Sequence, residues 1–373
     1  MHSIRSSAAP IEDLAVNAYT IPTDGPESDA TYKWASTTLV LVEISAEGKT
    51  SLGYSYADIA TAVLIEQSLK PILLQHDALD VNASWEEMVG AVRNLGRPGI
   101  ASMAISAVDN SLWDLKARLL EIPLASLLGA FRKAIPIYGS GGFTSYSIEE
   151  LRDQLGGWAA QGIPRVKMKI GREPEHDFER VEAVRDALGD EPALMVDANG
   201  GYAQKQALAF AYEFEGLGVD WFEEPVSSDD LEGLRCLRDN APPGMEIAAG
   251  EYGYELPYFR RMLEAQAVDV LQADATRCGG ITGFLKAAIL AEANQVPLSS
   301  HCAPALHAHL GCAVRNFRHA EYFHDHVRIE NLLFEGTLHP QGGTLIPDLS
   351  RPGIGMEFKR ADAAQYRVKL GTR

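Results

Sequence analysis

The sequence predicts an α/β protein, an eight-stranded α/β barrel with a smaller α+β domain before it. The chain has 373 residues, 46% apolar and 23% charged, which is the composition of a globular protein with a large core. An α/β barrel takes roughly 250 residues as one unit, so one barrel and one smaller domain fit this length. Short apolar runs alternate with helical segments over most of the chain, which indicates parallel β-α-β units.

The first third of the chain has a different pattern. Residues 37–44 (TTLVLVEI) and 51–56 (SLGYSY) read as strands joined by a turn, which predicts an antiparallel hairpin. Helical periodicity follows over residues 57–74, 84–94 and 99–120. We therefore expect residues 1–130 to form a compact α+β domain.

Eight strand-length runs follow, and eight parallel strands close a barrel. They cover residues 135–141, 165–171, 193–200, 219–225, 247–251, 268–275, 296–302 and 319–323. We assign residues 131–344 to the barrel. The tail, residues 345–373, is loop-like, and we expect it to return to the first domain.

Charge and cysteine content exclude several classes of partner. The formal net charge of −18 repels nucleic acid and anionic membrane surfaces. Four cysteines without close pairing are no disulfide scaffold, which favours a reducing, cytoplasmic setting. Met1 to Leu14 contains Arg5 but no apolar run after it, and no stretch approaches the roughly 18 apolar residues of a membrane span.

Ionisable residues fall near the ends of seven successive barrel strands. The carboxyl ends of parallel barrel strands share one face, so these side chains should meet at a single mouth. Taken singly, an acid after a strand is usually a helix cap, but capping does not explain the whole series. The residues are Lys167, Lys169, Asp197, Glu223, Glu251, Asp274, His301 and Glu321.

Three of these acids suggest a metal site. Asp197, Glu223 and Glu251 end adjacent strands and offer hard oxygen ligands without a nearby cysteine or histidine, which suits Mg²⁺ better than zinc. Without a cation, such carboxylates would repel one another and take up protons. Glu224 should point to the other side of its strand and is not included in the ligand set.

The bases of the site are predicted from spacing. Lys167 and Lys169 share one side of their strand, and we expect their mutual repulsion to lower a lysine pKa toward the range of a general base. Asp274 and His301 end neighbouring strands, so the carboxylate can orient the imidazole for proton transfer. Glu321 fits either a neutral hydrogen-bond donor or a salt-bridge partner.

Other histidines carry weaker signals. His307 and His309 fall in a predicted helix and are interpreted as structural. A second group resembles a metal tract, but a solvated turn after the last strand is the favoured interpretation. This group is His324, Asp325 and His326.

The ordered set of motifs resembles the enolase superfamily, and within it the mandelate racemase subgroup. The motifs are K-x-K from Lys167, VDANGGY from Val196, WFEEP from Trp221, GE at Gly250, D-x-x-x-x-GG from Asp274, SSH from Ser299 and Glu321. The resemblance implies a (β/α)7β modified TIM barrel, with an N-terminal α+β capping domain that the C-terminal tail completes. It also implies a specificity loop, which we place at residues 20–36.

The resemblance further implies roles for the site residues. Mg²⁺ on the three carboxylates would chelate the carboxylate of a small substrate. Lys169 and the Asp274–His301 pair would flank the substrate α-carbon. Lys167 and Glu321 would stabilise the enolate oxygens, and Asn199 would contact a substrate hydroxyl. A homo-oligomer is expected on the same basis.

The favoured reaction is dehydration of an acid sugar to a 2-keto-3-deoxy acid, through removal of the proton α to a carboxylate. Racemisation or epimerisation of a 2-hydroxy acid by the same residues is the first alternative. A non-catalytic binding protein on the same barrel is the second. The substrate depends on side chains whose orientation the sequence does not reveal, among them Tyr32, Lys33, Trp34, Arg277 and Tyr322.

Overall fold

The first layer of the structure is an antiparallel sheet covered by helices, which forms the capping domain. The computed structural model describes residues 8–370. The sheet contains β1 (Asp13–Ser28), β2 (Lys33–Ala46), β3 (Lys49–Thr50) and β4 (Gly53–Tyr56). Its helices are α1 (Ile59–Leu64), the π-helical turn η1 (Ile65–Leu69), α2 (Lys70–Leu73), α3 (Val81–Ala91) and α4 (Ile100–Leu119). The pairing of β2 with β4 confirms the predicted hairpin.

The loop expected over residues 20–36 is mostly strand, which corrects the sequence interpretation. Strand β1 runs antiparallel to β2 along almost its whole length, with an irregularity between Pro22 and Glu27. Proline, aspartate and glycine in this stretch are typical of turns. Pairing with β2 nevertheless keeps the backbone extended on both sides of the irregularity, and such tertiary pairing overrides local preference.

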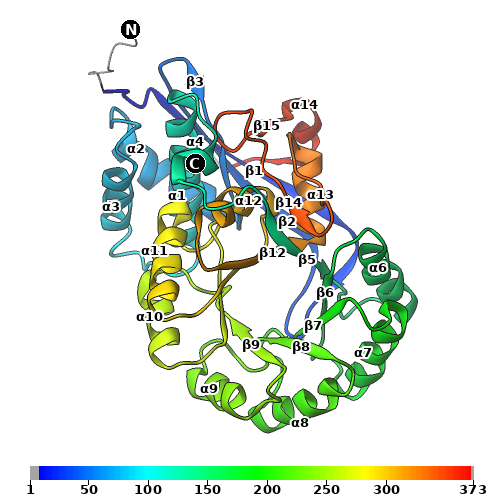
Figure 1. Ribbon diagram of the computed structural model, residues 1–373. Coiled ribbons are helices and arrows are strands. Elements are labelled where there is room, and N and C mark those ends of the chain that lie inside the picture. Colours follow the sequence, from blue (N-terminus) through cyan, green and yellow to red (C-terminus); the bar gives the residue numbers. More distant parts are fainter. Residues whose placement is uncertain (1–7, 371–373) are drawn as a thin grey trace.

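The barrel itself is as predicted. Its strands are β5 (Ile135–Gly141), β6 (Arg165–Lys169), β7 (Ala193–Asp197), β8 (Val219–Glu223), β9 (Glu246–Ala249), β10 (Val270–Ala273), β11 (Leu298–Ser300) and β12 (Phe317–Phe323). Neighbouring strands are parallel, and pairing of β12 with β5 closes the ring (Figure 1). A closed parallel ring directs all carboxyl ends to one mouth.

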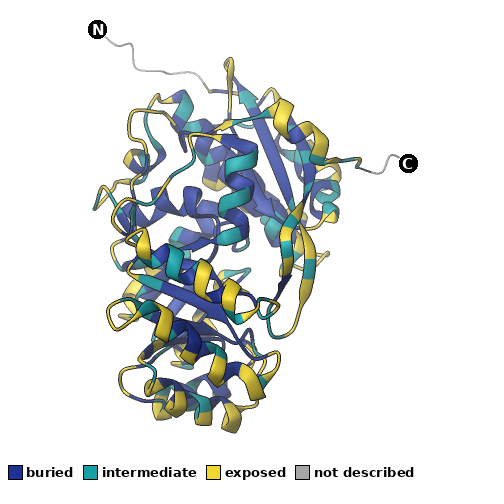
Figure 2. Ribbon diagram, turned by 90° about the vertical axis from the view of Figure 1, so that its right-hand side faces the viewer, coloured by how far each residue is buried: buried dark blue, intermediate teal, exposed yellow. Residues whose placement is uncertain are grey.

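Seven helices follow the first seven barrel strands and surround them. They are α6 (Ile148–Ala160), α7 (Pro174–Leu188), α8 (Gln204–Glu215), α9 (Leu231–Asn240), α10 (Leu256–Glu264), α11 (Gly280–Ala293) and α12 (Pro304–Ala313). Helix α5 (Leu124–Leu128) precedes the barrel, and α13 (His324–Leu333) follows β12. The barrel strands are mostly buried while the outer faces of these helices are exposed (Figure 2), so most strand residues other than those at the barrel mouth are apolar.

The C-terminal tail returns to the capping domain, as expected. Short strands β13 (Phe334–Glu335) and β15 (Glu357–Phe358) pair with each other, and β14 (Thr344–Leu345) pairs with β5. After α14 (Arg360–Ala363) and the 3₁₀ turn η2 (Ala364–Tyr366), strand β16 (Arg367–Val368) pairs with β1. The tail thus adds an edge strand to the capping sheet.

Helix α4 attaches the cap to the barrel at the loop that follows β10. The first turn of α11 has free backbone N–H groups, as every helix start does. Ser106 Oγ accepts from the N–H groups of Gly279 and Gly280, and Asp109 accepts from the N–H and hydroxyl of Thr282. The cap therefore satisfies the start of α11 and holds the loop that begins at the end of β10.

The tip of the β1–β2 hairpin rests on the barrel mouth. Ser28 bonds to Thr144 in the loop after β5, through its carbonyl at 2.9 Å and its hydroxyl at 2.7 Å. Arg172, after β6, donates to the carbonyls of Asp29 and Tyr32. These contacts place the hairpin over one side of the site.

No helix among residues 8–370 is both long and apolar enough to cross a membrane. The stretch from Met1 to Leu14, which lacks an apolar run, lies partly outside the described residues, since residues 1–7, including Arg5, are not described.

A buried histidine of α12 is hydrogen-bonded both to α5 and to the C-terminal tail. Its burial leads us to expect that the free energy of unfolding depends on pH. His309 Nδ1 accepts from the Ala125 N–H, and Nε2 donates to the Ile354 carbonyl. Burial lowers the pKa of His309 from 6.5 to about 4. Below pH 6.5 the unfolded chain binds the proton and the folded chain does not, so stability is lost as pH falls toward 4.

We expect this single group to remove about 2 kcal/mol of unfolding free energy between about pH 7.5 and pH 5. Urea unfolding of wild type and His309→Gln at both pH values measures it, because the glutamine keeps a donor and an acceptor without titrating. An equal loss in both proteins would show that His309 is not a source of the effect.

Candidate active site

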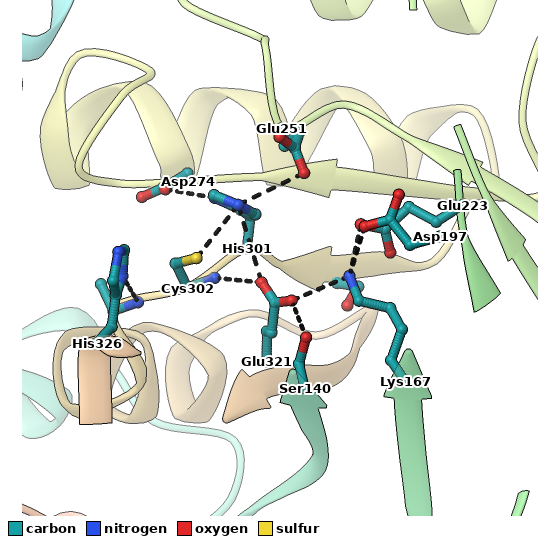
Figure 3. A network of polar contacts seen from close by, with 12 residues as sticks. Ser140, Lys167, Asp197, Glu223, Glu251, Asp274, His301, Cys302, Glu321 and His326 are labelled. Atoms are coloured by element: carbon teal, nitrogen blue, oxygen red, sulfur yellow. Dashed lines mark hydrogen bonds and ion pairs between the residues drawn. The ribbon is translucent and has the colours of Figure 1, made fainter. Parts of the chain in front are cut away.

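The structure brings the predicted ionisable residues to one mouth of the barrel (Figure 3). Lys167 and Lys169 lie on β6, Asp197 ends β7 and Glu223 ends β8. The other four lie on or just after strands β9 to β12 and are Glu251, Asp274, His301 and Glu321. All eight are buried.

Three carboxylates form a group that fits a divalent cation. One oxygen each from Asp197, Glu223 and Glu251 lies within 4.8 Å of the other two. Glu251 Oε2 is buried and has no hydrogen-bond partner, which is costly unless a ligand satisfies it. Burial and the charge of Asp197 raise the pKa of Glu223 well above its usual range, as expected for acids gathered without a cation.

The local charge balance supports the same fit. Lys167 contacts Glu223 at 2.6 Å, Glu321 at 2.9 Å and Asp197 at 3.4 Å. With Lys169, Glu251 and the Glu251 partner Arg277 included, the formal count is four carboxylates against three cationic side chains. The remaining negative charge favours a bound cation, and hard oxygen ligands suit Mg²⁺.

The expected fall in lysine pKa is wrong for this structure. Burial disfavours the charged form of Lys169, but Asp197 at 2.5 Å outweighs burial and the repulsion from Lys167, so the pKa of Lys169 is raised. The pKa of Lys167 is raised as well, because Glu223 and Glu321 outweigh its burial. Carboxylates, not the other lysine, are the nearest charges to each ammonium group.

Asp274 and His301 form a hydrogen-bonded pair. His301 Nδ1 lies 2.7 Å from Asp274 Oδ2, while Asp274 Oδ1 accepts from the N–H and hydroxyl of Thr276. Burial opposes ionisation of Asp274, yet the hydrogen bond and charge of His301, with the charges of His307 and Arg277, hold the pKa of Asp274 below its usual range. An ionised Asp274 keeps the Nδ1 proton in place, so His301 Nε2 is the nitrogen available for proton transfer.

Glu321 is a salt-bridge partner in this structure. Lys167 and His301 overcome the effect of burial and hold the pKa of Glu321 well below its usual range. Glu321 accepts from Ser140 Oγ at 2.6 Å and from the Cys302 N–H at 2.8 Å. Of the two interpretations of Glu321 that the sequence allowed, the ion pair is the one this structure contains.

A cavity of about 430 Å³ opens above these groups. Lys169 and His301 both line it, as do Asn199, Glu251 and Glu321. Asn199 Oδ1 is buried and has no hydrogen-bond partner, which leaves it able to accept from a ligand. Lys167 is fully buried and does not line this cavity, so it contacts the carboxylates rather than the open space.

Two family profiles match the chain. Residues 14–129 match the profile described as mandelate racemase/muconate lactonizing enzyme, N-terminal domain, and residues 150–363 match enolase C-terminal domain-like. The chain belongs to the mandelate racemase/muconate lactonizing enzyme family of the enolase superfamily. This membership confirms the resemblance found in the sequence, together with the barrel and its cap.

Three known proteins are similar to this chain over nearly its whole length. A solved mandelate racemase/muconate lactonizing enzyme-like protein from Rubrobacter xylanophilus is 55% identical, with TM-score 0.94 over 96% of this chain and all of that one. The 3,6-anhydro-α-L-galactonate cycloisomerase of Streptomyces coelicolor is 33% identical over 94% of this chain and 98% of its own. L-talarate/galactarate dehydratase of Salmonella typhimurium, solved with Mg and L-lyxarohydroxamate, is 30% identical, with TM-score 0.90 over 99% and 95%.

The structure contradicts the sequence interpretation of the group after β12, His324, Asp325 and His326, as a solvated turn. The expected solvated turn is the first turn of α13, where Asp325 and His326 are buried. Asp325 accepts from Thr37, and His326 stacks on Tyr56, so the cap covers this turn. Only His324 is partly exposed, and it pairs with Asp24 of β1 at 3.0 Å.

His307 and His309 lie in α12, as expected, and are buried and hydrogen-bonded. His307 Nε2 accepts from the Ala275 N–H in the loop after β10. The loop that follows Asp274 is thus held from two sides, by α4 and by α12.

Sequence reasoning missed several neighbours of the site. Ser140 near the end of β5 and Cys302 beside His301 both contact Glu321. Tyr138 lies under Lys167. Arg277, which the sequence placed among the substrate-determining side chains, pairs with Glu251 at 3.4 Å. Ser140 follows the same rule as the acids, since it lies near a strand end, but only ionisable residues were considered there.

The metal site predicts a difference between two adjacent glutamates. We expect Glu223→Gln to weaken Mg²⁺ binding at least about 100-fold, because it removes a charged ligand. Glu224→Gln should weaken it by less than about tenfold, since Glu224 lines a neighbouring cavity and is not part of the ligand group, although its charge adds to that of Glu251. Titration calorimetry measures both, with thermal unfolding as the check on folding. Equal losses would contradict the ligand assignment.

Proposed function

We propose that this protein is a Mg²⁺-dependent enzyme that removes the proton α to a carboxylate and dehydrates an acid sugar to a 2-keto-3-deoxy acid. One observation carries the proposal. Glu251 of the three-carboxylate group lines the same cavity as Lys169 and His301, and Asp274 holds His301 from behind through Nδ1. An α-proton of a carboxylate is removed at a useful rate only where the resulting dianion is stabilised, and this arrangement supplies stabilisation beside two bases.

The cation site has a defined part in this proposal. Asp197, Glu223 and Glu251 hold Mg²⁺, which when bound attracts the substrate carboxylate and stabilises the charge of the enediolate. It also provides the local positive charge that a protein of net charge −18 otherwise denies to an anionic substrate.

Two groups handle protons. Either Lys169 Nζ or His301 Nε2 takes the α-proton, and the electron pair left on the α-carbon forms the enediolate. Lys169 does so as the neutral amine, a form that a cation held by Asp197 would favour by weakening the Lys169–Asp197 ion pair. When the neighbouring carbon carries a hydroxyl, the electron pair of the enediolate forms a double bond between the α-carbon and that carbon, and the C–O bond breaks with its electron pair leaving on oxygen. The conjugate acid of one of the two bases protonates the departing oxygen, and water is released. The resulting enol tautomerises to the 2-keto acid.

Other residues position these groups. Lys167 forms ion pairs with Glu223 and Glu321, and Ser140 donates a hydrogen bond to Glu321. Asn199 offers its free carbonyl oxygen to a substrate hydroxyl. The Asn199 backbone lies in the left-handed region, with φ 42°, and its N–H donates to Asp197 at 2.9 Å. The turn after β7 therefore orients a ligand of the cation and also places the side chain that would contact the substrate.

Racemisation remains the second candidate, because Lys169 and His301 come from separate strands and could act on opposite faces of one carbon. A solved protein from Streptomyces coelicolor described as a racemase is also similar, at 31% identity. Other similar proteins are dehydratases and cycloisomerases, among them those of L-talarate/galactarate and of 3,6-anhydro-α-L-galactonate. Their substrates favour a polyhydroxy acid over a simple 2-hydroxy acid for this chain.

Product analysis separates the two reactions. We expect a panel of acid sugars with Mg²⁺ to yield a 2-keto acid, detected with semicarbazide, and chelation of the metal to stop the reaction. Deuterium entering the α-carbon from D₂O without keto product would instead identify an epimerase. Neither product nor exchange across the panel would argue against enzymatic α-proton removal.

The proton-transfer roles predict large losses from small changes. Lys169→Ala and His301→Asn should each lower kcat at least about 1000-fold, because each removes an acid or base. Lys205→Ala and His339→Asn make the same chemical changes at exposed positions and should keep the wild-type rate. A Lys169 or His301 variant with a near-normal rate would show that the residue is not the acid or base.

We also propose that the protein is a cytoplasmic homo-oligomer. Its acidic net charge and its membership of a family of metabolic enzymes support this. Light scattering of the purified protein tests the oligomeric state.

A further inference from the structure

The two ends of the cavity differ in charge. At the reactive end, the lining cations are already paired: Lys169 with Asp197 at 2.5 Å, and Arg277 with Glu251 at 3.4 Å. These cations lie beside the cation site, where the reacting carboxylate of the substrate would bind. The far end of a bound acid sugar would face the cap.

The cap wall of the cavity is acidic and rich in hydroxyl groups. Asp29 and Asp58 are its charged side chains among the described residues. The uncharged hydrogen-bonding side chains of the wall are Tyr32, Trp34, Ser36, Thr37, Thr38 and Tyr56. Hydroxyl groups exchange hydrogen bonds well with the hydroxyls of a sugar chain.

Cations near this wall are held elsewhere. Arg172 donates to the carbonyls of Asp29 and Tyr32, which fixes the hairpin tip, and Arg328 pairs with Asp325 at 2.5 Å. Lys33 is exposed and precedes Trp34 on β2, so it lies on the opposite face of the strand. The lining histidine His326 is uncharged near neutral pH, because burial lowers its pKa well below the usual value.

Aromatic rings complete the wall. Tyr32 and Trp34 stack with ring centroids 6.0 Å apart, and Trp34 packs edge-on against Phe143. The Trp34 N–H donates to Glu27 at 2.6 Å, which fixes the indole. Flat aromatic faces suit the C–H groups of a polyol chain, which is the apolar side of a sugar.

From this wall we infer that the cavity selects aldonates, which carry one carboxylate and a neutral far end, over aldarates, which carry a carboxylate at each end. The inference rests on the proposed function and narrows its substrate class. Asp29 is half-buried and Asp58 is exposed at the rim of the cavity, so a second carboxylate at this end would meet like charge and no free cation. A terminal hydroxymethyl group would meet hydroxyl partners and aromatic faces.

Matched pairs of acids test the inference. Each aldonate is assayed beside the aldarate of the same configuration, with saturating Mg²⁺ and keto-acid detection. We expect kcat/KM to be at least about 100-fold higher for the best aldonate than for its aldarate. Aldarates turned over equally well or better would overturn the inference and leave the dehydratase proposal standing. Turnover of neither class would remove the proposed function, and the inference with it.

Two charge changes on the cap sharpen the test. Ser36→Arg places a cation on the cavity wall, and Asp29→Asn removes a negative charge while keeping an oxygen that accepts the N–H groups of Thr31 and Tyr32. Both should raise kcat/KM for aldarates relative to aldonates, by about tenfold or more.

The matched control is Ala35→Arg, which adds the same charge one residue away. Ala35 is exposed and does not line the cavity. The aldarate preference should move in Ser36→Arg and not in Ala35→Arg. Equal shifts in both would mean that overall charge, and not the cavity wall, decides the preference, and would overturn the inference.

Discussion

The active site depends on one buried ammonium group. Lys167 is fully buried, and its three carboxylate contacts come from β7, β8 and β12. Without that charge, the carboxylates would repel one another in a medium that screens poorly, and removing one partner of a buried ion pair costs about 3–5 kcal/mol. Lys167 therefore allows acids from separate strands to share one mouth.

The same charge balance explains why the site is suited to a divalent cation. Lys167 and Lys169 neutralise only part of the surrounding acid, and Glu251 Oε2 accepts no hydrogen bond, although it lies 3.5 Å from His301 Nε2. The unfavourable interactions left in the protein alone are those that a cation would relieve. Stability has been given up locally in favour of ligand binding, which is common at functional sites.

The cap contributes in two ways that are physically separate. Helix α4 supplies hydrogen-bond acceptors to the start of α11 and thereby steadies the loop that begins at Asp274. The β1–β2 hairpin rests on the loops after β5 and β6 and forms the far wall of the cavity. The barrel thus provides the reacting groups, and the cap provides both support and the surface that meets the rest of the substrate.

The sequence by itself determined the barrel, the cap and the membership of the site, because strand periodicity and parallel connections direct residues such as Asp197, Glu223 and His301 to one face. It could not determine their electrostatics. The raised pKa of Lys169, the ion pair of Glu321 and the burial of His326 depend on which charges and surfaces lie nearest in space. Those neighbours come from distant strands and from the cap, so only the tertiary structure decided them.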